Sequence, residues 1–226
     1  FKGIIIRLGK GFNKIDLKNK KLIVGAGVLD STLSKFALRN SIMNLEFYSG
    51  IPGTVGGAVK MNAGCYGSET KDVIESVITI NRLGEENFHN ISDLNFKYRS
   101  SSINNDLIVK EVVFKAIIGR PKEIELRMKN IINQRESSQP LRNKTGGSTF
   151  KNPKGFFAAK LIEEAGCKGM QVGDAIVSSK HANFLINQNN ASATDIEILG
   201  EKIKEQVFNK FNILLDWEII IIGDKT

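Results

Sequence analysis

The stretch GIPGTVGGAVKMNAGCYG, residues Gly50–Gly67, decides how the first half of this chain is built. It holds six glycines and one proline in eighteen residues and only one charged side chain, that of Lys60. Glycine reaches φ > 0 and has no Cβ, so this composition predicts a loop instead of an ordinary helix or strand. Backbone N–H groups that point to one spot bind an anion such as a pyrophosphate. The segment matches neither the P-loop nor the Rossmann fingerprint, so it is either another kind of anion cradle or a glycine-rich structural turn.

The overall composition limits the class of protein. The chain has 226 residues, of which 41% are apolar and 25% are charged. This is enough for one large domain or two ordinary domains with a hydrophobic core. Because no apolar run approaches the roughly eighteen residues of a membrane-spanning helix, we expect no membrane span.

Cysteine and histidine content and net charge narrow the chemistry. Cys65 and Cys167 form no CxxC motif, and the only histidines are His89 and His181. We therefore expect a protein of the reducing cytoplasm without a metal site. The net charge of +8 suits either nucleic acid or small anionic ligands. Because the basic residues are scattered along the chain, we expect no nucleic-acid partner.

The first half, to about Asn143, is predicted to be rich in strands. Runs of β-branched residues bounded by Gly, Asn or Asp are typical of strands. Four segments have this pattern: GIIIRL (3–8), KLIVGAG (21–27), ESVITIN (75–81) and DLIVKEVVFKAI (106–117). We also predict one helix capped by Asp30 or Ser31, and a second that starts after Pro121 and ends before SSQP (137–140).

The second half alternates helices and strands. GFFAAKLIEEAG (155–166) is predicted to be a helix that ends at its last glycine, and HANFLIN (181–187) a strand. A further helix carries a capping signal at Ser192 or Thr194. One stripe of that helix is apolar and is expected to face a core: Ile196, Leu199, Ile203 and Val207. NILLDWEIIIIG (212–223) is predicted to be a buried closing strand.

Three further segments carry side chains suited to chemistry. Arg99, in KYRSS (97–101), can clamp a carboxylate with two hydrogen bonds, or it is a solvated loop arginine. Ser148, in TGGSTFKNP (145–153), has no G-x-S-x-G elbow and no His/Asp partners, so it is either a proton donor or part of a plain turn. Glu218 lies in an apolar run, where it is either a buried carboxylate that needs a partner or a strand-edge residue facing solvent.

Taken together, these segments resemble one family, the UDP-N-acetylenolpyruvoylglucosamine reductases (MurB), which are flavoenzymes of bacterial cell-wall synthesis. GIPGTVGGAVKMNAGCYG is similar to their FAD-contacting segment, and YRSS (98–101) to their Tyr-Arg-x-Ser motif. GGSTFKNP (146–153) resembles their Gly-Ser-x-Phe-Lys-Asn-Pro motif, and CKGMQVGDAIVSSKHANFLIN (167–187) their substrate-domain signature. DWEIIIIG (216–223) is similar to their closing glutamate strand. Five motifs in this order over nearly the whole chain are highly specific.

The resemblance implies an α+β fold with two domains. Residues 1–143 would form an FAD-binding domain of the vanillyl-alcohol-oxidase (PCMH) type, incomplete at its N-terminus. Residues 144–226 would form a smaller α/β substrate-binding domain. Family members carry a further segment upstream, with a Gly-Ser-Asn turn against the FAD pyrophosphate, so we expect weaker FAD binding if the polypeptide begins at Phe1.

The resemblance also implies the reaction. NADPH would reduce FAD and leave, and UDP-N-acetylglucosamine enolpyruvate would take its place. Flavin N5 would pass a hydride to the alkene, and a proton would go to the carbon that bears the carboxylate. The product would be UDP-N-acetylmuramate, a precursor for peptidoglycan synthesis and hence for cell shape and cell division. We expect a cytoplasmic monomer.

The functional residues of the family carry over position by position. Arg99, Ser148 and Glu218 would be catalytic, as charge clamp, proton donor and hydrogen-bond donor to the negative charge that builds on the substrate. Asn152 and Lys168 would bind the substrate, the lysine near its phosphates. Ten positions would contact FAD: Gly50, Ile51, Pro52, Gly53, Thr54, Gly56, Gly57, Asn62, Gly64 and Arg135.

Two features differ from the family pattern. Some members have a lysine near position 138 that contacts substrate or cofactor, where this chain has Ser138. One branch has an extra loop whose tyrosine closes over the nucleotide, and FKNPKGFFAAK (150–160) leaves no room for it, so the chain resembles the shorter branch. The alternatives are another FAD-dependent oxidoreductase of this fold, a non-catalytic nucleotide-binding module and a nucleic-acid binder. Neither of the last two explains why Arg99, Ser148 and Glu218 occur together.

Overall fold

The computed structural model describes residues 2–223, and these form two compact units. We call residues 5–135 the larger unit, and residues 2–4 with 136–223 the smaller unit. Each unit has its own hydrophobic core and combines helices with antiparallel sheet. The predicted α+β class is confirmed.

The larger unit is built on a five-stranded antiparallel sheet in the order β1–β2–β7–β5–β6. Its strands are β1 (Ile15–Lys18), β2 (Lys21–Gly25), β5 (Ile74–Ile80), β6 (Glu86–Asn90) and β7 (Ile108–Lys115). Buried and more exposed side chains alternate along β2 and much of β7, because one face of the pleat packs on the core. The strands predicted from KLIVGAG, ESVITIN and DLIVKEVVFKAI are confirmed.

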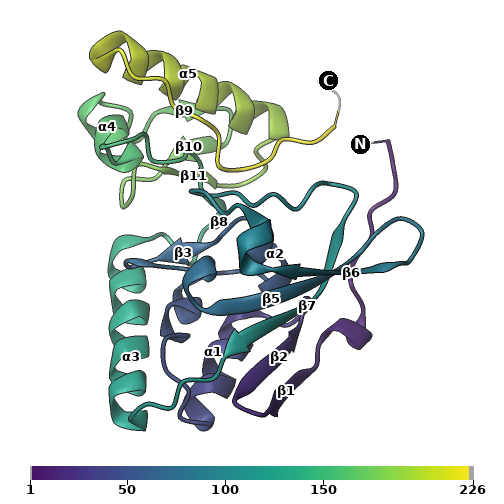
Figure 1. The fold of residues 1–226 in the computed structure, drawn as a ribbon. Helices are drawn as coiled ribbons and strands as arrows, with labels where there is room; N and C mark the ends of the chain where they lie inside the picture. The colour runs from purple at the N-terminus through teal and green to yellow at the C-terminus, as the bar shows by residue number, and fades with distance from the viewer. Residues whose placement is uncertain (1, 224–226) are drawn as a thin grey trace. The chain divides into compact units, whose positions relative to one another are not determined.

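Helices of the larger unit lie beside this sheet, with α1 and α3 next to each other (Figure 1). The helices are α1 (Asp30–Arg39), α2 (Val55–Lys60) and α3 (Pro121–Ser138), and α3 extends past the unit boundary. Short elements complete the unit: a hairpin of β3 (Gly64–Cys65) and β4 (Ser68–Glu69), and 3-10 turns η1 (Lys10–Phe12), η2 (Glu46–Gly50), η3 (Thr70–Asp72) and η4 (Ile91–Leu94). The predicted helix after Pro121 is confirmed and ends two residues later than expected.

Two local predictions near the N-terminus are wrong. Residues 3–8 form no strand, and Ile4 is 89% exposed, because no strand among the described residues pairs with this run. Helix α1 has Leu29 at its N-cap and no side-chain cap, so neither Asp30 nor Ser31 caps it. Asp30 is the first helical residue instead, and it is buried.

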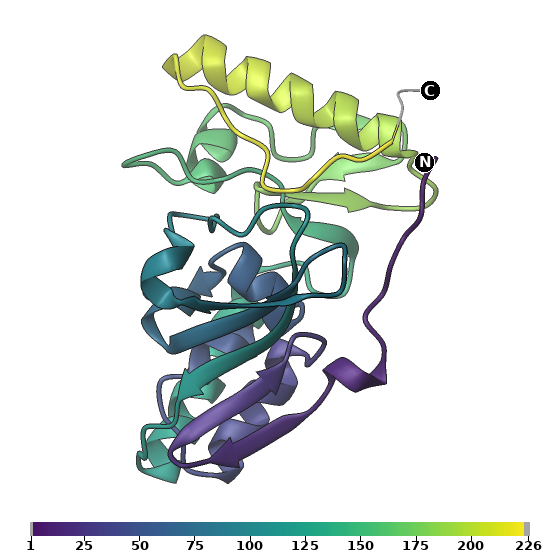
Figure 2. The ribbon, with the colours of Figure 1, turned by 45° about the vertical axis from the view of Figure 1, so that its right-hand side comes forward.

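The smaller unit has a four-stranded antiparallel sheet in the order β8–β11–β10–β9. Its elements are β8 (Lys144–Ser148), β9 (Gln171–Val172), β10 (Ala175–Val177), β11 (Phe184–Asn187), α4 (Ala158–Glu164) and α5 (Ala193–Phe211). Helix α5 lies over the sheet (Figure 2), and Leu199, Ile203 and Val207 are fully buried as predicted. Its N-cap is Ser192, which forms a capping box with Asp195.

The predicted closing strand at residues 212–223 is wrong. The segment makes one isolated bridge, between Phe150 and Trp217, and no strand. Beyond the bridge, Ile220 and Ile222 are 77% and 66% exposed. A run of isoleucines forms a buried strand only where a second layer covers it, and none of the described residues does so here.

Trp217, the one tryptophan of the chain, lies directly over Gly200 of α5. A Cβ at position 200 would be 1.9 Å from Cη2 of the indole ring. We therefore expect Gly200→Ala to lower the free energy of unfolding of the smaller unit by about 1–3 kcal/mol, because the ring must move. Urea unfolding followed by Trp217 fluorescence measures the loss. Gly146→Ala is the control, since its Cβ would make an ordinary 3.7 Å contact; equal stability of the two variants would contradict the prediction.

Within residues 2–223, no helix combines the length and the apolar character that crossing a membrane requires.

Candidate active site

The glycine segment is not a plain loop. Its middle is helix α2, whose sequence VGGAVK contains two glycines. The Thr54 hydroxyl accepts a hydrogen bond from the Gly57 N–H at 3.4 Å, and four of the six helical residues are buried. Capping and packing therefore outweigh the poor helix propensity of glycine, and the loop predicted for these residues is wrong.

Several glycines of the segment serve contacts within the protein. A Cβ on Gly64 would lie 2.3 Å from the backbone oxygen of Ser68, so only glycine allows the β3–β4 hairpin to close. A Cβ on Gly56 would lie 2.8 Å from that of Ala26. At these two positions glycine is needed for close packing within the protein.

At the turn Ile51–Thr54 the backbone of the segment is open to a ligand. Pro52 and Gly53 are exposed, and Gly53 has φ +140, which side chains other than hydrogen rarely allow. The turn is anchored by the Asp30 N–H, which donates to the Gly53 carbonyl at 3.1 Å. An exposed backbone held in this way can approach a dinucleotide closely.

A buried acid lies behind this turn. Asp30 is 1% exposed, and neither carboxyl oxygen has a hydrogen-bond partner among the described residues. Its Oδ2 is 3.5 Å from the place where a Gly53 Cβ would be. Burial raises the pKa of Asp30 to about 7. No sequence pattern indicates that Asp30 is buried, because an Asp before an apolar stripe is typical of a helix cap.

Arg99 and Arg135 converge at the end of the glycine segment. Arg99 lies in a turn with φ +54 and donates from a guanidinium nitrogen to the Gly64 carbonyl at 3.0 Å. Arg135 lies in the last turn of α3. Burial raises the pKa of the Cys65 thiol to about 11, and the positive charges of Arg99 and Arg135 oppose that shift. Both arginines are therefore close to the β3–β4 hairpin.

Ser148 and Glu218 lie on neighbouring backbone segments of the smaller unit. Ser148 ends β8 and pairs with Phe184 of β11. The Glu218 N–H donates to the carbonyl oxygen of Thr149 at 2.8 Å, one residue beyond Ser148. The structure thus brings these two predicted residues together, within one unit.

Asn183 fixes this arrangement and was not singled out from the sequence. Its side-chain amide donates to the Phe150 carbonyl at 2.8 Å, and its Oδ1 accepts from the Phe150 N–H at 2.9 Å. Asn183 is 4% exposed, so both bonds are shielded from water. No local sequence signal marks such a contact, because its partner is thirty-three positions away.

The two residues predicted to bind substrate also lie in the smaller unit. The Asn152 Oδ1 accepts a hydrogen bond at 2.9 Å from the N–H of Ala158, the first residue of α4. The Lys168 Nζ lies 2.6 Å from a carboxylate oxygen of Glu163 and is one-third exposed. Their roles toward a substrate stay predictions. Arg99 and the predicted FAD-contacting residues belong to the larger unit.

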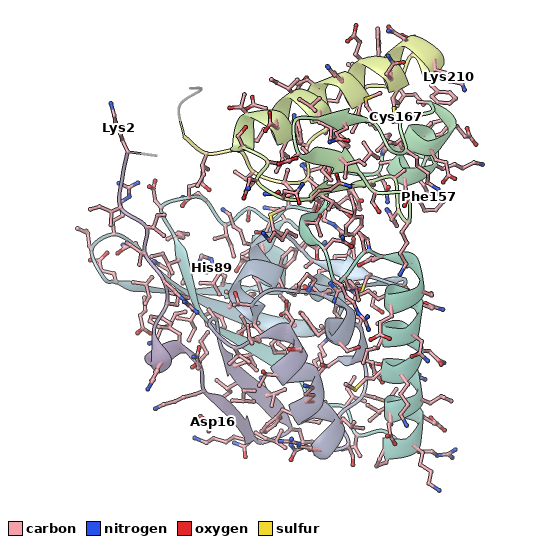
Figure 3. The ribbon with its side chains drawn as sticks, turned by 180° about the vertical axis from the view of Figure 1, so that it is seen from behind. Lys2, Asp16, His89, Phe157, Cys167 and Lys210 are labelled. Carbon is pink, nitrogen blue, oxygen red and sulfur yellow. The ribbon has the colours of Figure 1, made fainter. Side chains whose placement is uncertain are left out.

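The described residues offer no metal centre. His89 lies on β6, where its Nε2 is 2.9 Å from the Thr79 hydroxyl, and Cys167 is buried in the core of the smaller unit (Figure 3). Residues 2–223 contain no group of three or more His, Cys, Asp or Glu side chains that can hold a metal ion.

Two family profiles match the chain. The profile described as "FAD binding domain" matches residues 1–86. The profile described as "UDP-N-acetylenolpyruvoylglucosamine reductase, C-terminal domain" matches residues 139–222. The first match contains the glycine segment, and the second contains Ser148 and Glu218.

Curated relatives and a solved structure agree with these matches. The chain is 46% identical to a UDP-N-acetylenolpyruvoylglucosamine reductase of Caulobacter vibrioides, over 98% of this chain and 74% of that protein. It is 43% identical to the protein of that name from Rickettsia typhi, over 98% of this chain and 75% of that protein. The crystal structure of UDP-N-acetylenolpyruvylglucosamine reductase (MurB) from Thermus caldophilus superposes with a TM-score of 0.83 at 38% identity, covering 94% of this chain and 76% of that one.

Proposed function

Because the chain belongs to the family of UDP-N-acetylenolpyruvoylglucosamine reductases, we propose that it is an FAD-dependent enzyme that reduces UDP-N-acetylglucosamine enolpyruvate to UDP-N-acetylmuramate with NADPH. This is a step in the synthesis of peptidoglycan precursors. The observation that carries the proposal is the identity of 46% over nearly the whole chain, together with the presence of Arg99, Ser148 and Glu218 at the motif positions.

We assign FAD binding to residues 1–143 and substrate binding to residues 144–226. The open turn Ile51–Thr54 and the two arginines at the end of the glycine segment suit the diphosphate of FAD and the negative charge that a flavin ring takes up on reduction. We propose FAD contacts at Gly50, Ile51, Pro52, Gly53, Thr54, Gly56, Gly57, Gly64 and Arg135. Asn62, the tenth predicted position, has no exposed surface and supports this segment from within the protein. When bound, FAD supplies hydride exchange with a nicotinamide and with an activated alkene.

Three side chains of this chain would stabilise or neutralise the negative charge that the reaction creates on the substrate. Hydride addition to an enolpyruvyl carboxylate builds negative charge beside an existing anion, so a preorganised cation lowers the barrier. Arg99 is that cation, and Glu218, when protonated, donates a hydrogen bond to the same charge. Ser148 delivers the proton to the carbon that bears the carboxylate.

Asn152 and Lys168 are assigned to the substrate, Asn152 as a hydrogen-bonding group and Lys168 as a point charge near the diphosphate. The free thiols of Cys65 and Cys167 are consistent with a reducing cytoplasm, and a monomer stays our prediction for the oligomeric state.

An anaerobic stopped-flow experiment tests the function. We expect NADPH to bleach the flavin band at about 450 nm, and UDP-N-acetylglucosamine enolpyruvate to restore it. Bleaching that this substrate does not reverse would contradict the proposal and favour another oxidoreductase of the same fold. A protein that binds no flavin at all would also contradict it, in favour of a non-catalytic module.

A further inference from the structure

Asn62 occupies the left-handed position that ends helix α2. The Ala63 N–H donates to the Ala58 carbonyl at 2.8 Å, and the Asn62 N–H donates to the Val59 carbonyl at 3.2 Å. This is a Schellman motif, whose left-handed residue is most often glycine, and Asn62 has φ +42. Asparagine tolerates this conformation and adds what glycine lacks, a side-chain amide.

The amide of Asn62 is fully engaged with protein groups. Its Nδ2 donates to the Lys97 carbonyl at 3.0 Å and to a Glu69 carboxylate oxygen at 3.1 Å. Its Oδ1 accepts from the Lys71 N–H at 3.1 Å. Asn62 has no exposed surface, so water does not compete for these bonds. The side chain thus joins α2, the hairpin segment and the turn that begins at Lys97.

That turn carries Arg99 in a conformation that needs support. Lys97 and Ser100 exchange backbone hydrogen bonds at 3.0 and 3.2 Å, and Arg99 lies between them with φ +54. A left-handed backbone is strained for arginine, so contacts with the surrounding protein must hold it in place. The Lys97 carbonyl that closes the turn is the one that receives the Asn62 amide. The Ser101 hydroxyl, which donates to the Lys60 carbonyl at 2.9 Å, ties the far side of the turn to the same helix.

We propose that Asn62 is a positioning residue for Arg99, because its buried amide holds the Lys97–Ser100 turn against the C-terminal end of α2. The inference rests on the proposed function, in which Arg99 stabilises negative charge on the substrate. The side chain of Asn62 acts through its hydrogen bond to the Lys97 carbonyl and does not touch the reacting atoms.

Asn62→Gly is the sharpest variant, because glycine keeps the left-handed helix end and removes only the amide. Asn212→Gly is its matched control. Asn212 is the left-handed C-cap of α5, with φ 55, and it is exposed. Asn62→Asp is a second variant that keeps the acceptor for the Lys71 N–H and loses the donor to Lys97.

The first measurement is hydrogen–deuterium exchange, which needs no activity. We expect the amides of residues 97–101 to exchange about tenfold faster in Asn62→Gly, because the turn opens more often. Asn62→Asp should do the same, and Asn212→Gly should leave these amides unchanged. Unchanged exchange in both Asn62 variants would overturn the proposal.

The second measurement separates the half-reactions. In Asn62→Gly we expect flavin reoxidation by the enolpyruvyl substrate to slow by about ten- to a hundredfold, since the displaced charge acts at that step. Reduction by NADPH should change less than about twofold. In an Arg99→Gln background, Asn62→Gly should cause no further loss, because its effect passes through Arg99.

The outcomes are distinct. Equal slowing of both half-reactions, or a full loss that persists in the Arg99→Gln background, would mean a general structural role and would overturn the proposal. If the wild-type protein shows no flavin reduction by NADPH, the proposed function fails, and the exchange data on residues 97–101 still decide whether Asn62 holds the turn.

Discussion

Replacing Ser148 with alanine is expected to slow reoxidation of the reduced flavin by UDP-N-acetylglucosamine enolpyruvate by about 10²- to 10⁴-fold. The hydride step leaves a carbanionic centre that must take a proton, and the alanine has none to give. Reduction of the flavin by NADPH should keep its rate, because that half-reaction transfers no proton to carbon. Anaerobic stopped-flow absorbance at the flavin band follows each half-reaction separately.

Ser179→Ala is the matched control for this change, since Ser179 is an exposed serine of the same unit. It should leave both half-reactions unaltered. If Ser148→Ala reoxidises at the wild-type rate, Ser148 is not the proton donor. If both half-reactions slow equally, the change acts through structure or flavin binding instead.

Replacing Asp30 with asparagine is expected to stabilise the larger unit by roughly 4 kcal/mol more at pH 8 than at pH 4. The pKa of Asp30 is about 7 in the folded protein, against an ordinary value of 3.8. Between these values the unfolded chain releases the proton that the folded protein retains, so wild-type stability falls as pH rises and levels off above about pH 7. Each pH unit in that window is worth about 1.4 kcal/mol. Asparagine has no proton to lose, so its stability lacks this decline.

Urea unfolding followed by circular dichroism at pH 4 and pH 8 measures the effect. Burial, and to a smaller extent the charge of Asp30, raises the pKa of Tyr48 and of Cys65, so neither group titrates within this window. Asp16→Asn, on the exposed face of β1 (Figure 3), controls for removal of a surface carboxylate. A difference between wild type and Asp30→Asn that does not change with pH would show that Asp30 is ionised when folded.

Elements whose stability is local could be predicted from the sequence. The stripe through Leu199 and the cap at Ser192 specify α5, because helix periodicity and capping need no distant partner. Segments 3–8 and 212–223 have the same isoleucine-rich composition as true strands and form none. A strand forms only where another strand pairs with it and another layer covers it, and the sequence of the strand alone specifies neither of these.

Some residues of the candidate site could be predicted from the sequence and others could not. Motif order led to Arg99, Ser148 and Glu218, and the structure brings the last two together on adjacent backbone segments. The glycine content has two structural uses: the space that Gly56 and Gly64 leave is filled by the protein itself, whereas Gly53 leaves an exposed stretch of backbone. The sequence could not identify Asp30 or Asn183 as site residues. Asp30 stands out because its carboxyl group is buried, and Asn183 because it bonds to the distant residue Phe150.

The position of Ser148 on a strand has a stereochemical consequence. Its backbone is paired with Phe184, and the next residue donates from its N–H to the Asn183 carbonyl at 2.8 Å, so the hydroxyl oxygen can move only by rotation about one bond. A donor with a single torsion reaches a planar carbon from one face. The enzyme would therefore set the handedness of the lactyl carbon through the geometry of a β-strand.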